Sequence, residues 1–366
     1  MLNKLPEGDH YITFTATDVK DKVRVYEMHL QITDASVATV TIDINDVYTS
    51  HATIYGSILK SDLTGLKFRY RAQGASDWTV VDATVDGTQM SASISGLTAS
   101  TTYEYQAICD GFTIADVMTF TTEDAAQLPN NSFEDWQTSS SPYLIYAAGD
   151  DMFWDSGNHG SATMSKNVTV PSTTLFHSGS RSIDLKSQFV GIGSIGKFAA
   201  GNVFVGKYLK TDGTDGILGW GRPFASRPTK LTGYVKYSPK TIDNNAGVVD
   251  GATGMDKGQI FIALWDDSKE TDSSTGESWP KIIKTKSSDR MLFDSNSEHI
   301  IAYGTIIFTE ATEGEGLIPF TINLEYRSNK RPSAIILTCS ASYYGDYFCG
   351  GNGSEMWLDD LQLVYE

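Results

Sequence analysis

The sequence has few cysteines and lacks any long apolar run. Its three cysteines are an odd number, so they do not form the paired framework of a small disulfide-stabilised protein. Cys109 stands in a strand pattern typical of a buried thiol, whereas Cys339 and Cys349 flank a tyrosine-rich loop and either pair or remain thiols. Nowhere do about 20 apolar residues follow one another, which excludes a membrane-spanning helix.

Basic residues are also scarce. The chain has 28 Lys and Arg against 45 Asp and Glu, and its formal net charge is −17. Such a surface repels phosphate backbones and anionic lipids, so the composition argues against nucleic acid and membrane surfaces as partners. Neutral glycans carry no charge, and a polysaccharide or glycan is compatible with this balance.

Familiar catalytic signatures are missing. There is neither a Gly-x-Ser-x-Gly elbow nor a His-Glu-x-x-His motif, and the six histidines are scattered without metal-ligand spacing. Residues Gly191 to Gly196 match the dinucleotide fingerprint, but a glycine-broken strand pattern follows them instead of the helix that would hold a pyrophosphate.

Glycoside hydrolysis needs two carboxylates roughly 5 to 10 Å apart. The candidates are Asp150, Asp151, Asp155, Asp266, Asp267, Glu325 and Asp346.

What the sequence does contain is the alternation of β-strands. Its 366 residues predict two or three domains, and no long amphipathic helix occurs after residue 127, so the expected class is all-β. Within residues 1–35, Tyr11 to Phe14 and Val23 to Ile32 alternate like two strands. Two strands cannot bury a core, so we expect the C-terminal strands of a truncated immunoglobulin-like domain, with an export signal further upstream.

Residues 36–123 predict a β-sandwich of seven short strands. The expected strands are Val37 to Ile44, Ala52 to Ile58, Leu66 to Ala72, Trp78 to Ala83, Gln89 to Ile94, Thr102 to Cys109 and Val117 to Thr122. The stretch Ile94 to Tyr105 resembles the corner of a fibronectin type III domain, with Leu97 in the core and Tyr103 as the corner tyrosine. The resemblance implies a spacer rather than an enzyme.

Residues 127–366 carry three matches to jelly-roll carbohydrate-binding modules. The opening Asn130 to Trp136, the turn Phe176 to Leu185 and the closing Trp357 to Leu363 resemble the first strand, an early turn and the last strand of those modules. Continuously apolar runs such as Gln259 to Trp265 indicate strands covered on both faces. We therefore expect a larger jelly-roll β-sandwich after the fibronectin-like spacer.

The stretch Gly219 to Tyr237 is a glycine- and proline-rich bend that runs into an alternating strand, as a binding loop on a sheet does. It resembles the central motif of the putative carbohydrate metabolism domain family of Bacteroidetes. The resemblance implies a protein of the bacterial surface or periplasm that works in polysaccharide utilisation, beside other surface glycan-utilisation proteins. It does not name a reaction.

Aromatic side chains on loops bind sugars by stacking on the apolar faces of the rings. The candidate carbohydrate-binding residues are Trp220, Arg222, Trp154, Trp279, Tyr343 and Tyr344. For each aromatic residue the alternative is packing that fixes a long loop. Trp136, Trp265 and Trp357 lie in strand patterns and are expected in the core.

No cofactor is required by these motifs, but the jelly-roll resemblance implies a structural calcium. Glu134, Asp359 or Asp360, and backbone oxygens around residues 178–180, would hold it. The alternative is that these carboxylates cap turns or pair with basic side chains. The sequence as a whole favours glycan binding by the C-terminal domain; a glycoside hydrolase and a structural or adhesion protein are the alternatives.

Overall fold

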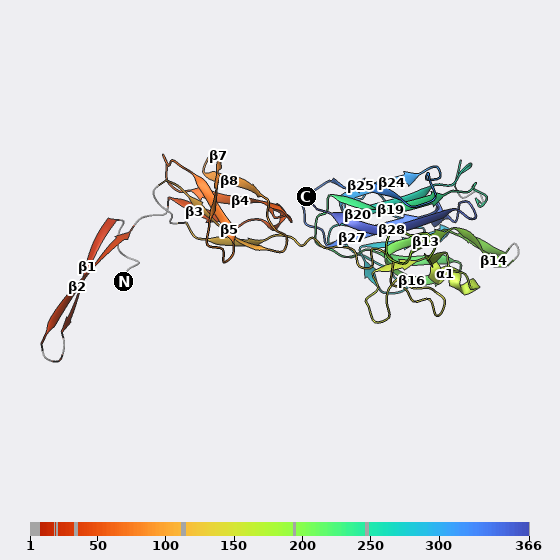
Figure 1. The fold of residues 1–366 in the computed structure, drawn as a ribbon, viewed down its shortest axis with the longest axis horizontal. Coiled ribbons are helices and arrows are strands. Elements are labelled where there is room, and N and C mark those ends of the chain that lie inside the picture. Colours follow the sequence, from red (N-terminus) through yellow and green to blue (C-terminus); the bar gives the residue numbers. More distant parts are fainter. Residues whose placement is uncertain are drawn as a thin grey trace. The chain divides into compact units, whose positions relative to one another are not determined.

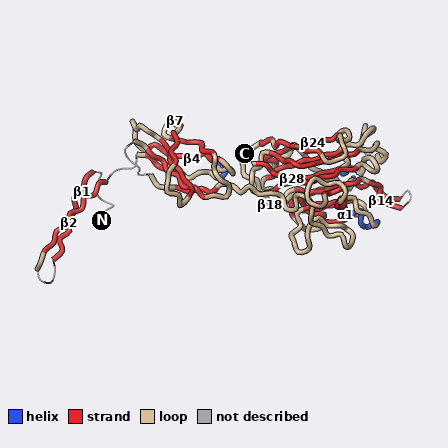
Figure 2. Tube along the Cα trace, viewed as in Figure 1, coloured by secondary structure: helices blue, strands red, loops and turns tan. Residues whose placement is uncertain are grey.

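The computed structural model describes residues 8–17, 19, 21–32, 36–110, 115–192, 195–245 and 249–365. It divides into two compact units, Met1–Val47 with His51–Thr122 and Tyr48–Ser50 with Glu123–Glu366. Strands dominate both units, and the predicted all-β sandwich class is confirmed (Figures 1 and 2). In the described part of the chain, no helix has the length and apolar character needed to cross a bilayer.

The first unit begins with an antiparallel pair, β1 (Gly8–Thr17) and β2 (Val23–Ile32), where alternation predicted two strands. Two four-stranded sheets follow. One has the order β3 (Val37–Val40), β4 (His51–Ile58), β8 (Gln89–Ser95) and β7 (Thr84–Asp86). The other has the order β10 (Met118–Thr121), β9 (Thr102–Ile108), β5 (Lys67–Ala72) and β6 (Thr79–Asp82), and a short 3-10 turn, η2 (Ile44–Asp46), follows β3.

The core of the first unit forms from alternate residues of these strands. Ile54, Phe68 and Tyr105 are fully buried, and Leu97 joins them as predicted. The Thr98 amide donates a hydrogen bond of 2.9 Å to the Tyr103 hydroxyl, which is the contact expected of a corner tyrosine. The assignment to the fibronectin type III family, and that of β1 and β2 to an immunoglobulin-like domain, stay predictions.

The second unit contains a nine-stranded sheet. Its main path is β23 (Lys281–Lys284), β17 (Asp215–Trp220), β16 (Asn202–Asp212), β27 (Ala334–Ser340), β20 (Gly258–Trp265), β24 (Ile300–Phe308) and β26 (Glu325–Tyr326). Two further strands join it, β11 (Trp154–Ser156) beside β16 and β18 (Arg222–Pro223) beside β27.

A five-stranded sheet packs against it. Its order is β12 (Thr169–Ser172), β13 (Ser182–Lys186), β28 (Glu355–Val364), β19 (Lys230–Ser238) and β25 (Ile318–Asn323). The hairpins β14 (Gln188–Ile192) with β15 (Ile195–Ala199) and β21 (Glu270–Thr271) with β22 (Ser278–Trp279) stand apart. The helical pieces are α1 (Asn158–Ser161), η3 (Ala162–Met164), η4 (Ser287–Asp289) and η5 (Gly345–Tyr347).

The main core lies between these two sheets. In β19, Leu231, Val235 and Tyr237 point inward because side chains alternate along a strand. In β20 every residue from Ile260 to Trp265 is buried, because the inner face meets the five-stranded sheet and the outer face carries a second aromatic cluster. The continuously apolar sequence of this strand is thereby explained.

The opening segment differs from expectation. Residues 130–132 form a turn and residues 133–136 have no regular secondary structure, so they do not form the expected first strand of a jelly roll. Asn130 and Phe133 have φ of 45° and 53°, values that break an extended chain, yet the Phe133 side chain is fully buried in the main core. The closing strand β28 is present as predicted. The hairpin β14–β15 occupies the glycine-rich match, so no helix follows the described glycines.

Candidate functional site

A cavity of about 400 Å³ lies in the second unit, beside α1. Its walls come from α1 and η3, the hairpin β14–β15, the strands β16 and β17, and the loop that carries η5. Three aromatic residues line it, Phe198, Tyr208 and Phe348, of which Phe198 is only 2% exposed. Hydrogen-bonding side chains stand among them, including Asn202, Thr211 and Thr285. This mixture of ring faces and neutral polar groups suits a small polar ligand with apolar faces.

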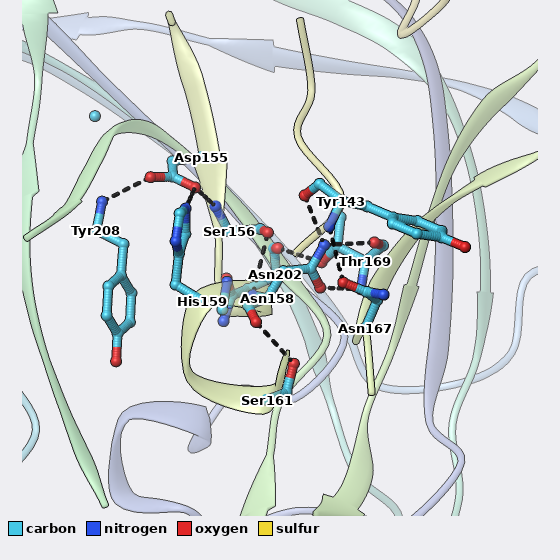
Figure 3. A network of polar contacts seen from close by, with 12 residues as sticks. Tyr143, Asp155, Ser156, Asn158, His159, Ser161, Asn167, Thr169, Asn202 and Tyr208 are labelled. Carbon is cyan, nitrogen blue, oxygen red and sulfur yellow. Dashed lines mark hydrogen bonds and ion pairs between the residues drawn. The ribbon is translucent and has the colours of Figure 1, made fainter. Parts of the chain in front are cut away.

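A buried carboxylate holds the lining residue Tyr208 in place, through the polar network drawn in Figure 3. Asp155, on β11, is 4% exposed; its Oδ2 accepts the Tyr208 amide at 2.7 Å and its Oδ1 accepts the Ser156 amide at 2.8 Å. The Nε2 atom of His159 lies 3.1 Å from Asp155 Oδ1. The adjacent Asp155 carboxylate, which accepts from the imidazole, raises the pKa of His159, although burial opposes the rise. The carboxylate thus links β11, β16 and α1.

The imidazole of His159 also stacks on the ring of Tyr208, with centroids 5.3 Å apart and planes 17° apart. The Tyr208 hydroxyl reaches Thr211 Oγ1 at 2.9 Å. One ring face is therefore occupied by protein, the hydroxyl is engaged, and the orientation of Tyr208 in the cavity wall is set before any ligand arrives.

The short helix α1 is held by a fully buried asparagine. Asn158 Oδ1 accepts the amides of Val168 and Thr169, both at 2.9 Å, and its Nδ2 donates to the Thr169 carbonyl at 2.7 Å (Figure 3). Asn202 Oδ1 accepts the Gly157 amide at 2.9 Å. A helix of one turn has little stability of its own, so these bonds fix its position.

Charged side chains also line the cavity. Lys197 Nζ bonds both oxygens of Asp215 at 3.0 Å and lies 4.0 Å from the centre of the Phe348 ring. Asp346, in η5, also lines the cavity, and burial raises the pKa of its carboxyl to about 6 against the opposing effect of Arg290. A carboxyl group of this kind exchanges its proton near neutral pH.

A second hollow of about 490 Å³ adjoins the first and shares Gly196, Lys197, Phe198 and Phe348 with it. Its own lining is more polar, with Asp243, Asn244 and Arg290. The Arg290 guanidinium lies 4.6 Å from the Tyr347 ring.

Three of the predicted aromatic candidates are buried, and their expected exposure is corrected. Trp154 is 1% exposed and donates its Nε1 hydrogen to the Pro129 carbonyl at 2.7 Å. Trp220 lies in the aromatic cluster on the outer face of the nine-stranded sheet, beside Phe204 and Phe261. Trp279 packs over Gly219, where a Cβ would lie 2.3 Å from its ring. Their glycine- and proline-rich surroundings bring strands close together rather than present rings to solvent.

The other candidates are more accessible. Arg222 donates from Nη2 to the Gly206 carbonyl at 3.1 Å and lies 4.8 Å from the Trp279 ring, so it braces β16 and β22. Tyr343 is 39% exposed and meets Tyr344 edge to face at 5.0 Å. They precede η5, so this loop borders the cavity, but it does so through Gly345, Asp346 and Phe348. Trp357, expected in the core, is half-buried on the outer face of β28.

The proposed calcium ligands are engaged by hydrogen-bond donors. Glu134 accepts the amides of Ser180 and Arg181 at 2.8 and 3.1 Å. Asp359 Oδ2 accepts the amides of His177 and Ser178 at 2.7 and 3.1 Å. The turn thus directs N–H groups at both carboxylates, whereas calcium needs oxygen ligands. Across the described ranges no group of three or more His, Cys, Asp or Glu is placed to hold a metal ion, and calcium binding by these two carboxylates with backbone oxygens stays a prediction.

From the sequence, no pairing of the histidines with aspartates was predicted. His159, His177 and His299 each lie within ion-pair distance of an aspartate, respectively Asp155, Asp360 and Asp266. For His159 a local signal existed, because Asp155 stands four residues earlier, one helical turn away. Phe198, Tyr208 and Phe348 gave no such signal, since Phe198 and Tyr208 lie on the consecutive strands β15 and β16 and Phe348 lies far along the chain, after η5.

The fold and the cavity define an all-β protein with a ligand-sized hollow in its larger unit. The chain belongs to the family described as the putative carbohydrate metabolism domain, whose model matches residues 132–364. No curated protein matches the chain.

Two solved structures are similar in outline. One, a putative glycoside hydrolase from Bacteroides thetaiotaomicron, is 21% identical with a TM-score of 0.48, over 88% of this chain and 87% of the other. The second, a putative glycoside hydrolase from Bacteroides vulgatus, is also 21% identical, with a TM-score of 0.46 over 64% of this chain and 97% of the other.

Proposed function

We propose that the second unit binds a neutral glycan in the cavity beside α1. The observation that carries the proposal is the lining itself: the rings of Phe198, Tyr208 and Phe348 stand among the neutral side chains of Asn202 and Thr211. Pyranose rings stack their C–H faces on aromatic rings, while hydroxyl and amide groups bond their hydroxyls. The match of residues 132–364 to the putative carbohydrate metabolism domain family independently supports a carbohydrate ligand.

The wider setting is proposed from the sequence resemblance. The protein would be exported to the bacterial surface or periplasm and act there beside other glycan-utilisation proteins. Its net charge of −17 is compatible with a neutral ligand, because an anionic one would be repelled. The tyrosine pair at Tyr343 and Tyr344 would extend the surface available to a longer chain.

The test is a binding screen of the full protein on neutral plant and yeast polysaccharides, with Tyr208→Leu and Tyr208→Phe compared on every hit. Removing the ring should lower affinity about tenfold, the order expected for the loss of one stacking contact. The phenylalanine variant keeps the ring and should bind within about twofold of wild type. Tyr55→Leu, a half-buried tyrosine of the first unit, is the matched control. Equal binding by Tyr208→Leu and wild type would contradict the proposal.

Hydrolysis is the second candidate, and Asp346 is the observation that favours it. A general acid in a glycosidase is a carboxyl group with a raised pKa, and burial raises the pKa of Asp346 to about 6. The adjoining hollow is lined by two further carboxylates, Asp243 and Asp215, and Asp215 is held by Lys197. Release of reducing sugar by wild type, and its loss in Asp346→Asn, would replace the binding proposal with an enzymatic one.

A further inference from the structure

A groove of about 520 Å³ lies on the outer face of the five-stranded sheet and shares no lining residue with the cavity. It runs over β28, β19 and β25. Its polar lining is Gln127, Asn131, Thr232, Tyr234, Thr321 and Gln362, with Asp360 at one side and Pro319 and Phe320 as apolar floor. Amides, hydroxyls and one aromatic ring therefore dominate the surface.

An irregularity in the sheet builds this groove. The register between β19 and β28 shifts between Thr232, which faces Gln362, and Tyr234, which faces Asp359. The extra residues bulge opposite Gly233, where a Cβ would lie 2.7 Å from Leu361. Asp360 has a φ of 48°, a left-handed value that is uncommon without glycine. Such bulges redirect side chains, and here Leu361 is buried while Asp360 lines the groove.

The bulge is secured from one side by the segment that precedes the sandwich. Gln127 donates to the Leu363 carbonyl at 2.7 Å and accepts the Leu363 amide at 2.9 Å. Asn131 donates to the Leu361 carbonyl, also at 2.7 Å. These bonds use both atoms of the Gln127 amide, so this wall is fixed by the protein itself.

The charge and the ring at the groove are also held in place. Asp360 Oδ2 lies 2.7 Å from His177 Nδ1, and its Oδ1 accepts the Ser178 hydroxyl at 2.9 Å. The His177 imidazole lies flat on the Tyr234 ring, with centroids 3.3 Å apart and planes 12° apart. The carboxylate has its partners, and the tyrosine ring has one face covered and its orientation fixed.

Three polar groups of the groove are left for a ligand. Among hydrogen bonds between described residues, none uses the hydroxyl of Tyr234, the hydroxyl of Thr321 or the side-chain amide of Gln362. Thr321 and Gln362 are exposed on neighbouring positions across β19, since Thr232 pairs with both of them. A row of unused donors and acceptors beside a tyrosine ring matches the alternating hydroxyls and C–H faces of a sugar.

We propose that this groove is a second saccharide-binding site, which takes a neutral sugar of the same polysaccharide that the cavity binds. The choice of ligand class rests on the proposed function, but the residues do not overlap. Two sites on one unit would hold a polysaccharide by multivalent attachment, so that the chain binds a polymer more tightly than either site binds a short oligosaccharide.

The test uses calorimetric titration of the full chain with cello-, xylo-, manno- and laminari-hexasaccharides. The groove variant is Thr321→Val with Gln362→Leu, which removes hydrogen-bonding groups at exposed positions while keeping side-chain size similar. The cavity variant is Tyr208→Leu. Thr84→Val with Gln89→Leu, at exposed positions of the first unit, is the matched surface control. Circular dichroism checks that each variant remains folded.

We expect two molecules of one hexasaccharide to bind per wild-type chain and one per chain in either site variant, with at least a fivefold loss of affinity for the polymer. If the groove variant keeps the stoichiometry and affinity of wild type while Tyr208→Leu loses binding, the second site is overturned and the cavity remains as the binding site. Binding lost only in the groove variant would support the second site and overturn the cavity. Failure of wild type to bind any probe would overturn both.

Discussion

Several buried charged side chains in this protein are paired with an oppositely charged group. The strongest case is Arg227 with Glu123, both in the second unit. Each side chain is 1% exposed, and Arg227 Nε lies 2.8 Å from Glu123 Oε1. Burial raises the pKa of Glu123 even so. A buried charge that loses its partner is costly, because neither water nor a counter-charge then solvates it.

Replacing Arg227 by methionine should therefore destabilise the second unit by about 3–5 kcal/mol, since Glu123 would be left buried with only the more distant Arg331. Urea unfolding followed by tryptophan fluorescence measures the effect. The double replacement Arg227→Met with Glu123→Leu should regain most of the loss. If the single variant were as stable as the double one, the pair would have no such role.

The His159–Asp155 pair gives a prediction about pH. The pKa of His159 is raised in the folded chain, so the pair stabilises the fold fully below the unfolded histidine value of about 6.5. That contribution is lost as pH rises through the higher folded value. The stability difference between wild type and His159→Gln should shrink from pH 6 to pH 8. Thermal melts across that range measure it, and a difference that grew with pH would contradict the assignment.

Strands β17 and β22 lie so close together that glycine is required at their contact. Gly219 on β17 lies under the indole of Trp279, and a Cβ there would lie 2.3 Å from that ring. Trp279 in turn lies under the guanidinium of Arg222. The close approach, rather than a turn, is what demands glycine at this position.

Gly219→Ala should displace Trp279 and cost about 1–3 kcal/mol, the usual penalty of overpacking. It should also free Arg222 from its ring contact. Gly316→Ala, at a position with no atom within 4 Å of the added Cβ, is the control and should be neutral. Chemical denaturation of the three proteins compares them; equal stabilities would mean that the β17–β22 contact is loose.

Strand elements could be predicted from sequence because alternation depends on neighbours in the chain. The run Gln259 to Trp265 became β20, and Ala334 to Ser340 is β27. The cavity could not be predicted, because its rings Phe198, Tyr208 and Phe348 meet only when a hairpin, a sheet strand and a loop fold together. The burial of Trp220 could not be predicted either, because a glycine-rich bend allows its side chain to point into the core or toward solvent.

At the scale of the whole molecule, each unit has its own core. Phe68 belongs to the buried cluster of the first unit and Ile262 to the main buried cluster of the second. Cooperative unfolding follows the packed core, so units with separate cores unfold as separate transitions.

Calorimetry should therefore resolve two transitions. Phe68→Ala, at a fully buried site, should destabilise the first unit by about 3–5 kcal/mol and lower only one of them. Ile262→Ala, also fully buried, should lower only the other. A single transition that both variants lower equally would show that the units unfold together.

The three cysteines supply an internal label for the same events. All are buried thiols, Cys109 in the first unit and Cys339 and Cys349 in the second, and burial raises the pKa of the latter two. A thiol reagent reacts with the exposed thiolate, so the folded chain should resist modification. The number of modified thiols then shows which unit has unfolded: one modified thiol indicates the first unit, and two indicate the second. Mass spectrometry could follow that opening in a crude extract, without purification or an added probe.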